Sequence, residues 1–181
     1  MSTLSRFLWL APFAAQIAYI LATYDQMPRL MGASPGDPGT RLHFFIAEWF
    51  AVVGIANIIF VFVHLKLHTF SDRMLSVPGK AYWLATEERR RTLLDRLRGI
   101  LEVSLFLLNV FFLAVYQSIY QTNVTRPLFQ LSEPILLFGF MILPVAIILA
   151  YLVWSMLGFA KTARDDAPSG QKESKNGSKE G

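Results

Sequence analysis

Cysteine is absent from this 181-residue sequence, and charged residues are scarce. Without cysteine the chain has no disulfide framework, thiolate zinc site, iron–sulfur cluster or cysteine nucleophile. Charged residues make up 17% of the chain and hydrophobic residues 54%, against about 25% and roughly 45–50% in ordinary soluble domains. This composition excludes an ordinary water-soluble core and indicates a protein whose main solvent is lipid.

Sequence motifs of common enzymes are also missing. The chain has no Gly-x-Ser-x-Gly elbow, no Gly-x-x-x-x-Gly-Lys phosphate loop, no dinucleotide fingerprint and no His-Glu-x-x-His zinc motif. No catalytic residue and no cofactor are therefore predicted.

Four apolar stretches are each long enough to cross a hydrocarbon core of about 30 Å as a helix. They cover residues 4–24, 44–67, 100–120 and 134–160. A signal peptide is the alternative for the first stretch, but the run is long and lacks a clear cleavage site. We predict an all-α membrane protein whose residues 1–160 form one up-down bundle of four transmembrane helices. The polar residues 161–181 are predicted to be a disordered cytoplasmic tail.

The distribution of lysine and arginine predicts the topology. With the N-terminus inside, 14 basic residues lie on the cytoplasmic side of the four spans and three lie outside. The positive-inside rule therefore predicts that both termini are cytoplasmic and that the chain is a multi-pass protein of the inner (cytoplasmic) membrane. This topology also accounts for the net charge of +4, so no nucleic-acid partner is predicted.

The cytoplasmic loop between the second and third spans is predicted to contain an amphipathic helix. Thr86 is a suitable N-cap, and two glutamates follow it in the first turn, where the helix dipole favours them. Apolar residues then recur every three or four positions into the third span, with Gly99 as the expected place to bend. The predicted lipid or partner contacts of this loop are Trp83, Arg89, Arg90 and Arg91.

Polar residues within the spans are the main candidate functional residues, because burying them in hydrocarbon is unfavourable unless another group pairs with them. The candidate intramembrane polar cluster consists of Gln16, Glu48, Asn57, Glu102 and Asn109. It has two interpretations. The residues line a proton or ion pathway, or they form interhelical hydrogen bonds that hold the bundle together.

Two histidines suggest a metal site as a further hypothesis. His64 and His68 are four residues apart and share one helical face, and Glu102 begins the third span at a similar depth. Two imidazoles and a carboxylate can bind a divalent metal. Hydrogen bonding of the histidines to headgroups, water or backbone is the alternative.

Residues 77–89 read Val-Pro-Gly-Lys-Ala-Tyr-Trp-Leu-Ala-Thr-Glu-Glu-Arg. This string resembles the Pro-Asn-Lys-x-Tyr-Trp-Leu-Ala-x-Glu stretch of uncharacterised bacterial membrane proteins with an SdpI-like domain, with Gly79 in place of the usual asparagine. Residues 24–28 are loosely similar to the start of that family's external loop. The resemblance implies a bacterial multi-pass membrane protein, with immunity or signal relay known for distant relatives, and it supplies no catalytic residues.

Together these patterns predict a non-enzymatic membrane protein that contacts the lipid bilayer and a membrane-protein partner or a second copy of itself. Two alternatives stay open. One is a small proton- or ion-coupled transporter that uses the intramembrane polar cluster, and the other is a metal-dependent membrane enzyme at the two histidines and Glu102.

Overall fold

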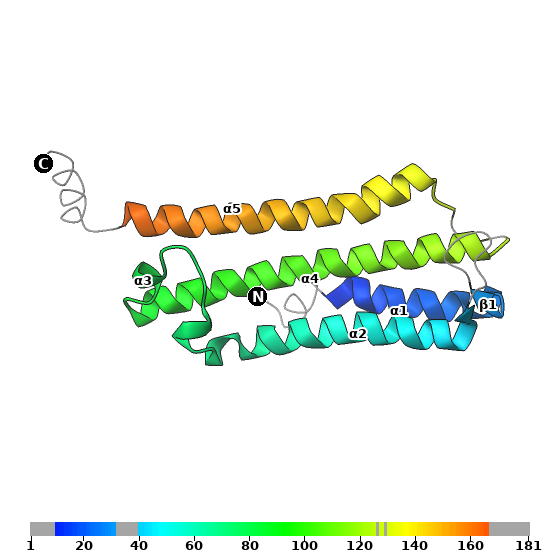
Figure 1. The fold of residues 1–181 in the computed structure, drawn as a ribbon, viewed down its shortest axis with the longest axis horizontal. Coiled ribbons are helices and arrows are strands. Elements are labelled where there is room, and N and C mark those ends of the chain that lie inside the picture. Colours follow the sequence, from blue (N-terminus) through cyan, green and yellow to red (C-terminus); the bar gives the residue numbers. More distant parts are fainter. Residues whose placement is uncertain (1–9, 32–39, 126, 129, 167–181) are drawn as a thin grey trace, which may run out of the picture. The chain divides into compact units, whose positions relative to one another are not determined.

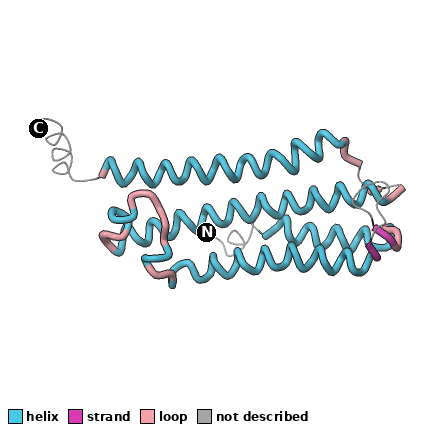
Figure 2. Tube along the Cα trace, viewed as in Figure 1, coloured by secondary structure: helices cyan, strands magenta, loops and turns pink. Residues whose placement is uncertain are grey.

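The computed structural model describes residues 10–31, 40–125, 127–128 and 130–166, and most of them are helical (Figures 1 and 2). The chain divides into two compact units. The first unit is formed by Met1–Leu65 with Leu101–Leu149, and the second by Lys66–Ile100 with Ala150–Gly181. Residues 161–165 of the predicted disordered tail 161–181 instead continue the last helix, Leu143–Asp165, because the helical hydrogen bonding runs on past the apolar stretch. Residues 167–181 of that tail and the first residues of the 4–24 span lie outside the described residues.

The first unit begins with the short helix α1, Ala11–Thr23. Pro12 lies in its first turn, where the missing N–H is no loss. A single 3-10 turn follows at Tyr24–Gln26. Strands β1, Leu30–Met31, and β2, Thr40–Arg41, then pair antiparallel at the start of the next helix (Figure 2).

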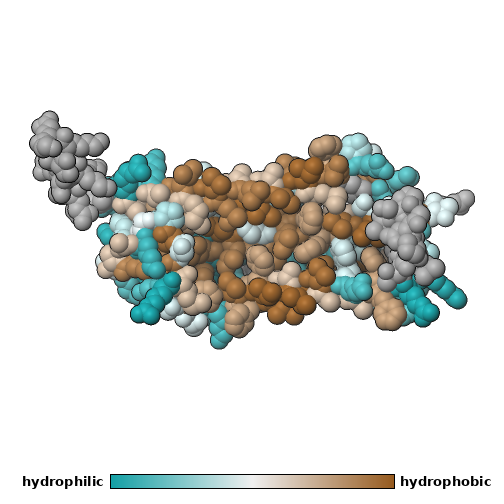
Figure 3. All heavy atoms as spheres, in the orientation of Figure 1, coloured by the Kyte–Doolittle hydropathy of each residue, from teal (hydrophilic) through white to brown (hydrophobic). Residues whose placement is uncertain are grey.

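Helix α2, Leu42–Lys66, is apolar on every side, and only Val53 and Asn57 are buried among its 25 residues. A helix of this kind suits a lipid environment, where side chains on the outer face need no polar character. In Figure 3 hydrophobic, brown spheres cover the middle of the helices on the face shown. The large exposed side chains of α2 are Phe44, Val52, Ile55, Ile58, Ile59, Phe62 and Leu65.

Aromatic residues form the core of the first unit. Tyr116 and Tyr120 of α4, Glu87–Asn123, are fully buried and stack with ring centroids 6.5 Å apart. Ile20 of α1 packs in the same cluster, and Trp49 of α2 packs against it. The hydroxyl groups of both tyrosines have partners: Tyr116 is hydrogen-bonded to Thr23 at 3.0 Å, and Tyr120 donates to Gln26 at 2.5 Å. The cluster therefore joins α1, α2 and α4.

The fourth apolar stretch begins with a π-helix, η5, Ile135–Ile142, and continues as α5, Leu143–Asp165. The N–H of Leu143 bonds to the carbonyl of Phe138, five residues back. Pro144 follows directly and has no N–H to give to the carbonyl four residues earlier, so an α-helical ladder cannot run unbroken through this point. The proline thus accounts for the irregular ladder at the junction of η5 and α5.

In the second unit, the loop after α2 packs against the last turns of α5. Two 3-10 turns, Leu67–Thr69 and Asp72–Met74, lead to the short helix α3, Lys80–Trp83. Gly79 has a positive φ of 73°, and a Cβ there would collide with the Cβ of Ala163. Position 79 therefore requires glycine for its backbone conformation and for this close approach.

Helix α4 is continuous from Glu87 to Asn123, Gly99 included. The N–H of Arg89 donates to the Thr86 hydroxyl at 3.3 Å, so the predicted N-cap is confirmed. The expected bend at Gly99 is not a break in the helix, because every residue around it keeps helical hydrogen bonding.

Three of the described helical segments are long and apolar enough to cross a membrane, namely Leu42–Thr69, Glu87–Asn123 and Leu137–Asp165. They overlap the second, third and fourth predicted spans. The described part of the first predicted span is α1, whose 13 residues measure about 20 Å at 1.5 Å per residue. The structure therefore supports a helical membrane protein, without fixing the number of spans.

Candidate functional site

Two asparagines form a closed pair between α2 and α4. The amide of Asn57 donates to Asn109 Oδ1 at 2.9 Å, and Asn109 donates back to Asn57 Oδ1 at 2.9 Å. Asn57 also donates to the carbonyl of Val53. Both asparagines are buried, at 4% and 0% exposure. Because each amide satisfies the other, the pair can join the two helices in an apolar environment.

His64 and Glu102 form a second pair on the same two helices. His64 Nε2 lies 2.8 Å from Glu102 Oε1, and the two side chains are 15% and 35% exposed. His64 is seven residues after Asn57, and Glu102 is seven residues before Asn109. Seven residues are about two turns, so the two pairs lie on one seam between antiparallel helices, about 10 Å apart along it.

Gln16 lies at the level of the asparagine pair, on α1. Thr23 bonds to Tyr116, and Gln16 and Asn109 are each seven residues before these partners on helices that run in the same direction. Gln16 is 1% exposed, and neither polar atom of its side chain has a hydrogen-bond partner among the described residues. An unsatisfied buried amide costs about 1–3 kcal/mol, so Gln16 is the one strained member of this polar layer.

Glu48 does not join the other predicted members of the cluster. It is exposed on α2, and it lies on the same helical face as large exposed apolar side chains. Phe44 and Val52 are one turn to either side of it, and Ile55 and Ile59 continue the face. We call this face, defined by residues 44, 48, 52, 55, 59 and 62, the α2 stripe. Glu48 is its one ionisable residue.

The described residues contain no group of three or more His, Asp or Glu side chains that could hold a metal ion. Of the predicted metal set, the structure brings together His64 and Glu102 only, and His68 is exposed. A carboxylate hydrogen-bonded to one imidazole is a polar pair, not a coordination site. The geometry thus gives the metal hypothesis no support.

Trp83, a predicted lipid or partner contact, is 2% exposed. Its ring meets Phe159 of α5 edge to face at 5.6 Å, and its indole N–H donates to the Phe159 carbonyl at 3.4 Å. The prediction of a surface contact does not fit this burial, because the indole is a core element of the second unit. The sequence does not reveal it, since its partner is 76 residues away.

The arginines predicted as contacts are mostly engaged within the second unit. Arg90 pairs with Asp72 at 3.1 Å, and Arg91 pairs with Glu87 at 3.3 Å. Arg89 lies over the ring of Tyr82, 4.2 Å from its centre. Carboxylate partners within the second unit therefore offset the charges of Arg90 and Arg91.

The hydroxyl of Tyr82 donates to Asp166 at 2.5 Å. The hydrogen bond to Asp166 raises the pKa of Tyr82 above its ordinary value, and desolvation adds to the effect. Tyr82 therefore keeps its proton at neutral pH and stays a donor. This bond joins α3 to the residue that directly follows α5 within the second unit.

Interhelical hydrogen bonding of these polar residues is one interpretation of the sequence, but the partners were not predicted, although a signal for the pairing was present. The interval of seven residues occurs both between Asn57 and His64 and between Glu102 and Asn109. Equal intervals on adjacent antiparallel helices predict two rungs, which the structure contains.

No protein-family model, curated protein or solved structure matches the chain. The functional conclusion therefore rests on the geometry of its own residues.

Proposed function

We propose that the chain is a non-enzymatic, multi-pass protein of the bacterial inner membrane that acts by binding another membrane protein through the α2 stripe. The proposal includes four spans with both termini in the cytoplasm, and membership of the SdpI-like proteins that the loop at residues 77–89 resembles. The excess of basic residues on one side supports the topology. If α1 continues toward the N-terminus through the apolar residues 4–10, it becomes long enough to span.

The observation that carries the proposed activity is the position of Glu48. The interior polar residues of α2, Asn57 and His64, are already paired with α4. Glu48 instead faces outward among large apolar side chains. A carboxylate on a lipid-facing surface is costly unless a donor covers it. We infer that a partner helix carrying a basic or hydroxyl side chain packs on the α2 stripe and binds Glu48.

The test is co-purification from native membranes with Glu48→Gln and Glu48→Leu. Both variants should insert normally and should lose a membrane protein that co-purifies with the unaltered chain. Glu133, exposed in the described residues beyond α4, provides the matched control, and Glu133→Gln should retain the partner. Unchanged co-purification after substitution of Glu48 would contradict the proposal.

A second candidate function is a proton- or ion-coupled carrier, and Gln16 is the observation that favours it. A buried amide without a protein partner, level with Asn57 and Asn109, is a feature expected along a polar path. The closed asparagine pair favours the structural interpretation instead. Transport assays on the unaltered chain, Gln16→Leu and Glu102→Gln separate the carrier from the binding protein. A carrier transports its substrate and loses flux in both variants, whereas a binding protein shows no flux in any of the three.

A further inference from the structure

A cavity of about 580 Å³ lies in the second unit between the N-terminal half of α4 and the C-terminal half of α5. Two glycines line it, Gly99 on α4 and Gly158 on α5. A Cβ at either position would meet nothing within 4 Å. The glycines thus leave room for another molecule without being required by close packing.

The charge at this cavity is uncompensated. Arg96 and Lys161 line it, and no carboxylate does so among the described residues. Neither residue has an ion-pair partner in the described part of the chain, whereas Arg90 and Arg91 each have one. Arg96 lies over the ring of Trp83, 5.2 Å from its centre. Two free cations beside an open cavity favour an anionic ligand.

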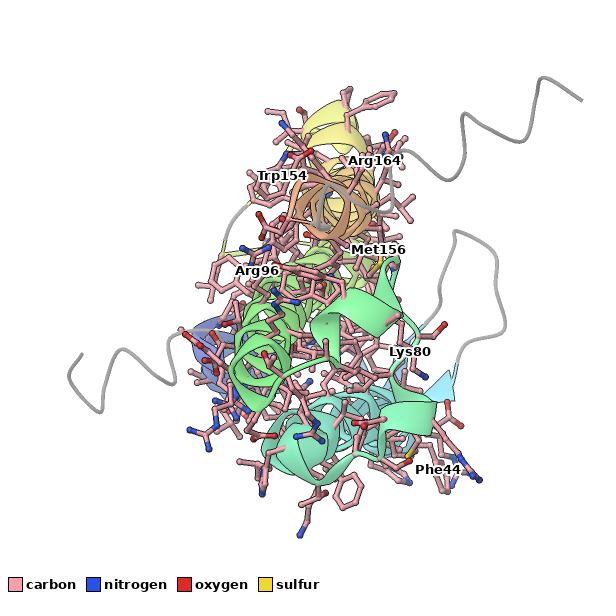
Figure 4. All side chains as sticks on the ribbon, turned by 90° about the vertical axis from the view of Figure 1, so that its left-hand side faces the viewer. Phe44, Lys80, Arg96, Trp154, Met156 and Arg164 are labelled. Atoms are coloured by element: carbon pink, nitrogen blue, oxygen red, sulfur yellow. The ribbon has the colours of Figure 1, made fainter. Side chains whose placement is uncertain are left out.

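The rest of the lining is amphipathic. Trp154 is 69% exposed and stacks on Tyr151, with ring centroids 6.1 Å apart. Figure 4 shows Trp154 on α5 and Arg96 on α4, viewed along the helices. Lys161 follows Trp154 by seven residues, about 10 Å along the helix. Ser155 and Thr162, each next in the chain to one of these residues, add hydroxyl donors to the lining. Tryptophan and tyrosine next to basic residues are typical of the headgroup region of a bilayer.

We propose that this cavity binds one anionic phospholipid. Its phosphate lies between Arg96 and Lys161, and an acyl chain runs over Gly99 and Gly158 toward Trp154. Basic pockets between transmembrane helices bind anionic headgroups in this way. A free phosphate would use only the cationic end and would leave the apolar lining uncovered. The site rests on the membrane location proposed above but not on the Glu48 contact.

Brominated lipids test the site, because bromine quenches a nearby tryptophan. The full chain is placed in phosphatidylcholine nanodiscs that contain brominated phosphatidylglycerol or brominated phosphatidylcholine. The Trp154 signal is obtained by difference from Trp154→Phe, since the chain has four tryptophans. At about fivefold per basic residue, phosphatidylglycerol should quench Trp154 at a roughly 25-fold lower fraction than phosphatidylcholine.

Substitutions of the lining residues test which of them produce the selectivity for phosphatidylglycerol. Arg96→Gln and Lys161→Gln should each reduce this selectivity about fivefold, and Arg96→Lys should keep most of it. Gly158→Leu, which adds a large side chain to the cavity lining where a Cβ meets nothing within 4 Å, should remove the selectivity. The matched control is Arg91→Gln on the same helix, which removes a charge already paired with Glu87 and should leave the selectivity unchanged.

Several results would overturn the site. They are equal quenching by the two lipids, an equal loss in Arg91→Gln, or full selectivity in Gly158→Leu. Displacement of the lipid by inorganic phosphate would assign the cavity to a free anion instead. A chain that fails to enter nanodiscs contradicts the membrane location itself, so this failure is distinguishable from the failure of the lipid site.

Discussion

The two units of this chain stabilise polar side chains in different ways. In the first unit, neutral amides are buried and satisfy each other, as with Asn57 and Asn109 at 4% and 0% exposure. In the second unit, charged groups pair at the surface, as with Arg91 and Glu87 at 76% and 63%. A buried pair is costly to break because the remaining group is left unsatisfied, whereas an exposed ion pair is screened by water.

This contrast teaches where to look for function. In the first unit, Asn57 and Asn109 hold α2 against α4. In the second unit, three arginines have a carboxylate partner, namely Arg90, Arg91 and Arg98. The residues left for binding are charged side chains that have no ion-pair partner among the described residues. Among them are Glu48 on the α2 stripe, and Arg96 with Lys161 beside the cavity.

The largest loss of stability is expected at Gly79, where the loop of the second unit packs closely against α5. Gly79→Ala should destabilise the protein by about 3 kcal/mol, because it combines a positive φ with a collision against Ala163. Equilibrium unfolding in mixed micelles measures this change. Ala163→Gly should restore part of the loss by relieving the collision alone. As a control, Gly99→Ala meets no atom and should be neutral or stabilising.

The buried pair of the first unit should give the next largest effect. Asn57→Leu should cost about 2 kcal/mol, since it leaves Asn109 buried with its reciprocal hydrogen bonds lost. The double variant Asn57→Leu with Asn109→Leu should be more stable than either single variant, because no amide is then unsatisfied. Additive losses in the same unfolding measurement would show that the two amides do not act as a pair.

The second polar pair between α2 and α4, His64 with Glu102, should contribute less to stability. Glu102→Leu should cost about 1 kcal/mol, because the carboxylate is 35% exposed and water or headgroups can satisfy His64 in its absence. The unfolding midpoint in mixed micelles measures this loss of stability, and Asn57→Leu is measured in the same way for comparison. A larger loss than for Asn57→Leu would reverse the order of the two rungs.

The smallest effect is expected from the exposed ion pair. Arg91→Gln should change stability by at most about 0.5 kcal/mol, and the change should vanish at high salt. Unfolding at low and high ionic strength tests this expectation. A salt-independent loss would mean that this part of the second unit is less exposed than its side chains indicate.

Some of this organisation was predictable from sequence because it is local. The N-cap at Thr86 and the helical, apolar segments follow from residue type and spacing. The burial of Trp83 and the pairing of Arg90 with Asp72 depend on distant chain segments, so no local pattern reveals them. The outward position of Glu48 also requires knowing which face of α2 meets α4. On a helix that is apolar all round, hydrophobicity does not identify that face.

The claim that Glu48 binds a membrane-protein partner is tested most directly by photocrosslinking in native membranes. A photoreactive residue replaces Val52, one turn from Glu48 on the α2 stripe, and another replaces Leu157, an exposed apolar residue of α5, as the control. We predict a protein adduct at position 52 that disappears with Glu48→Gln, and lipid adducts alone at position 157. Lipid adducts alone at position 52, whether residue 48 is Glu or Gln, would contradict the account.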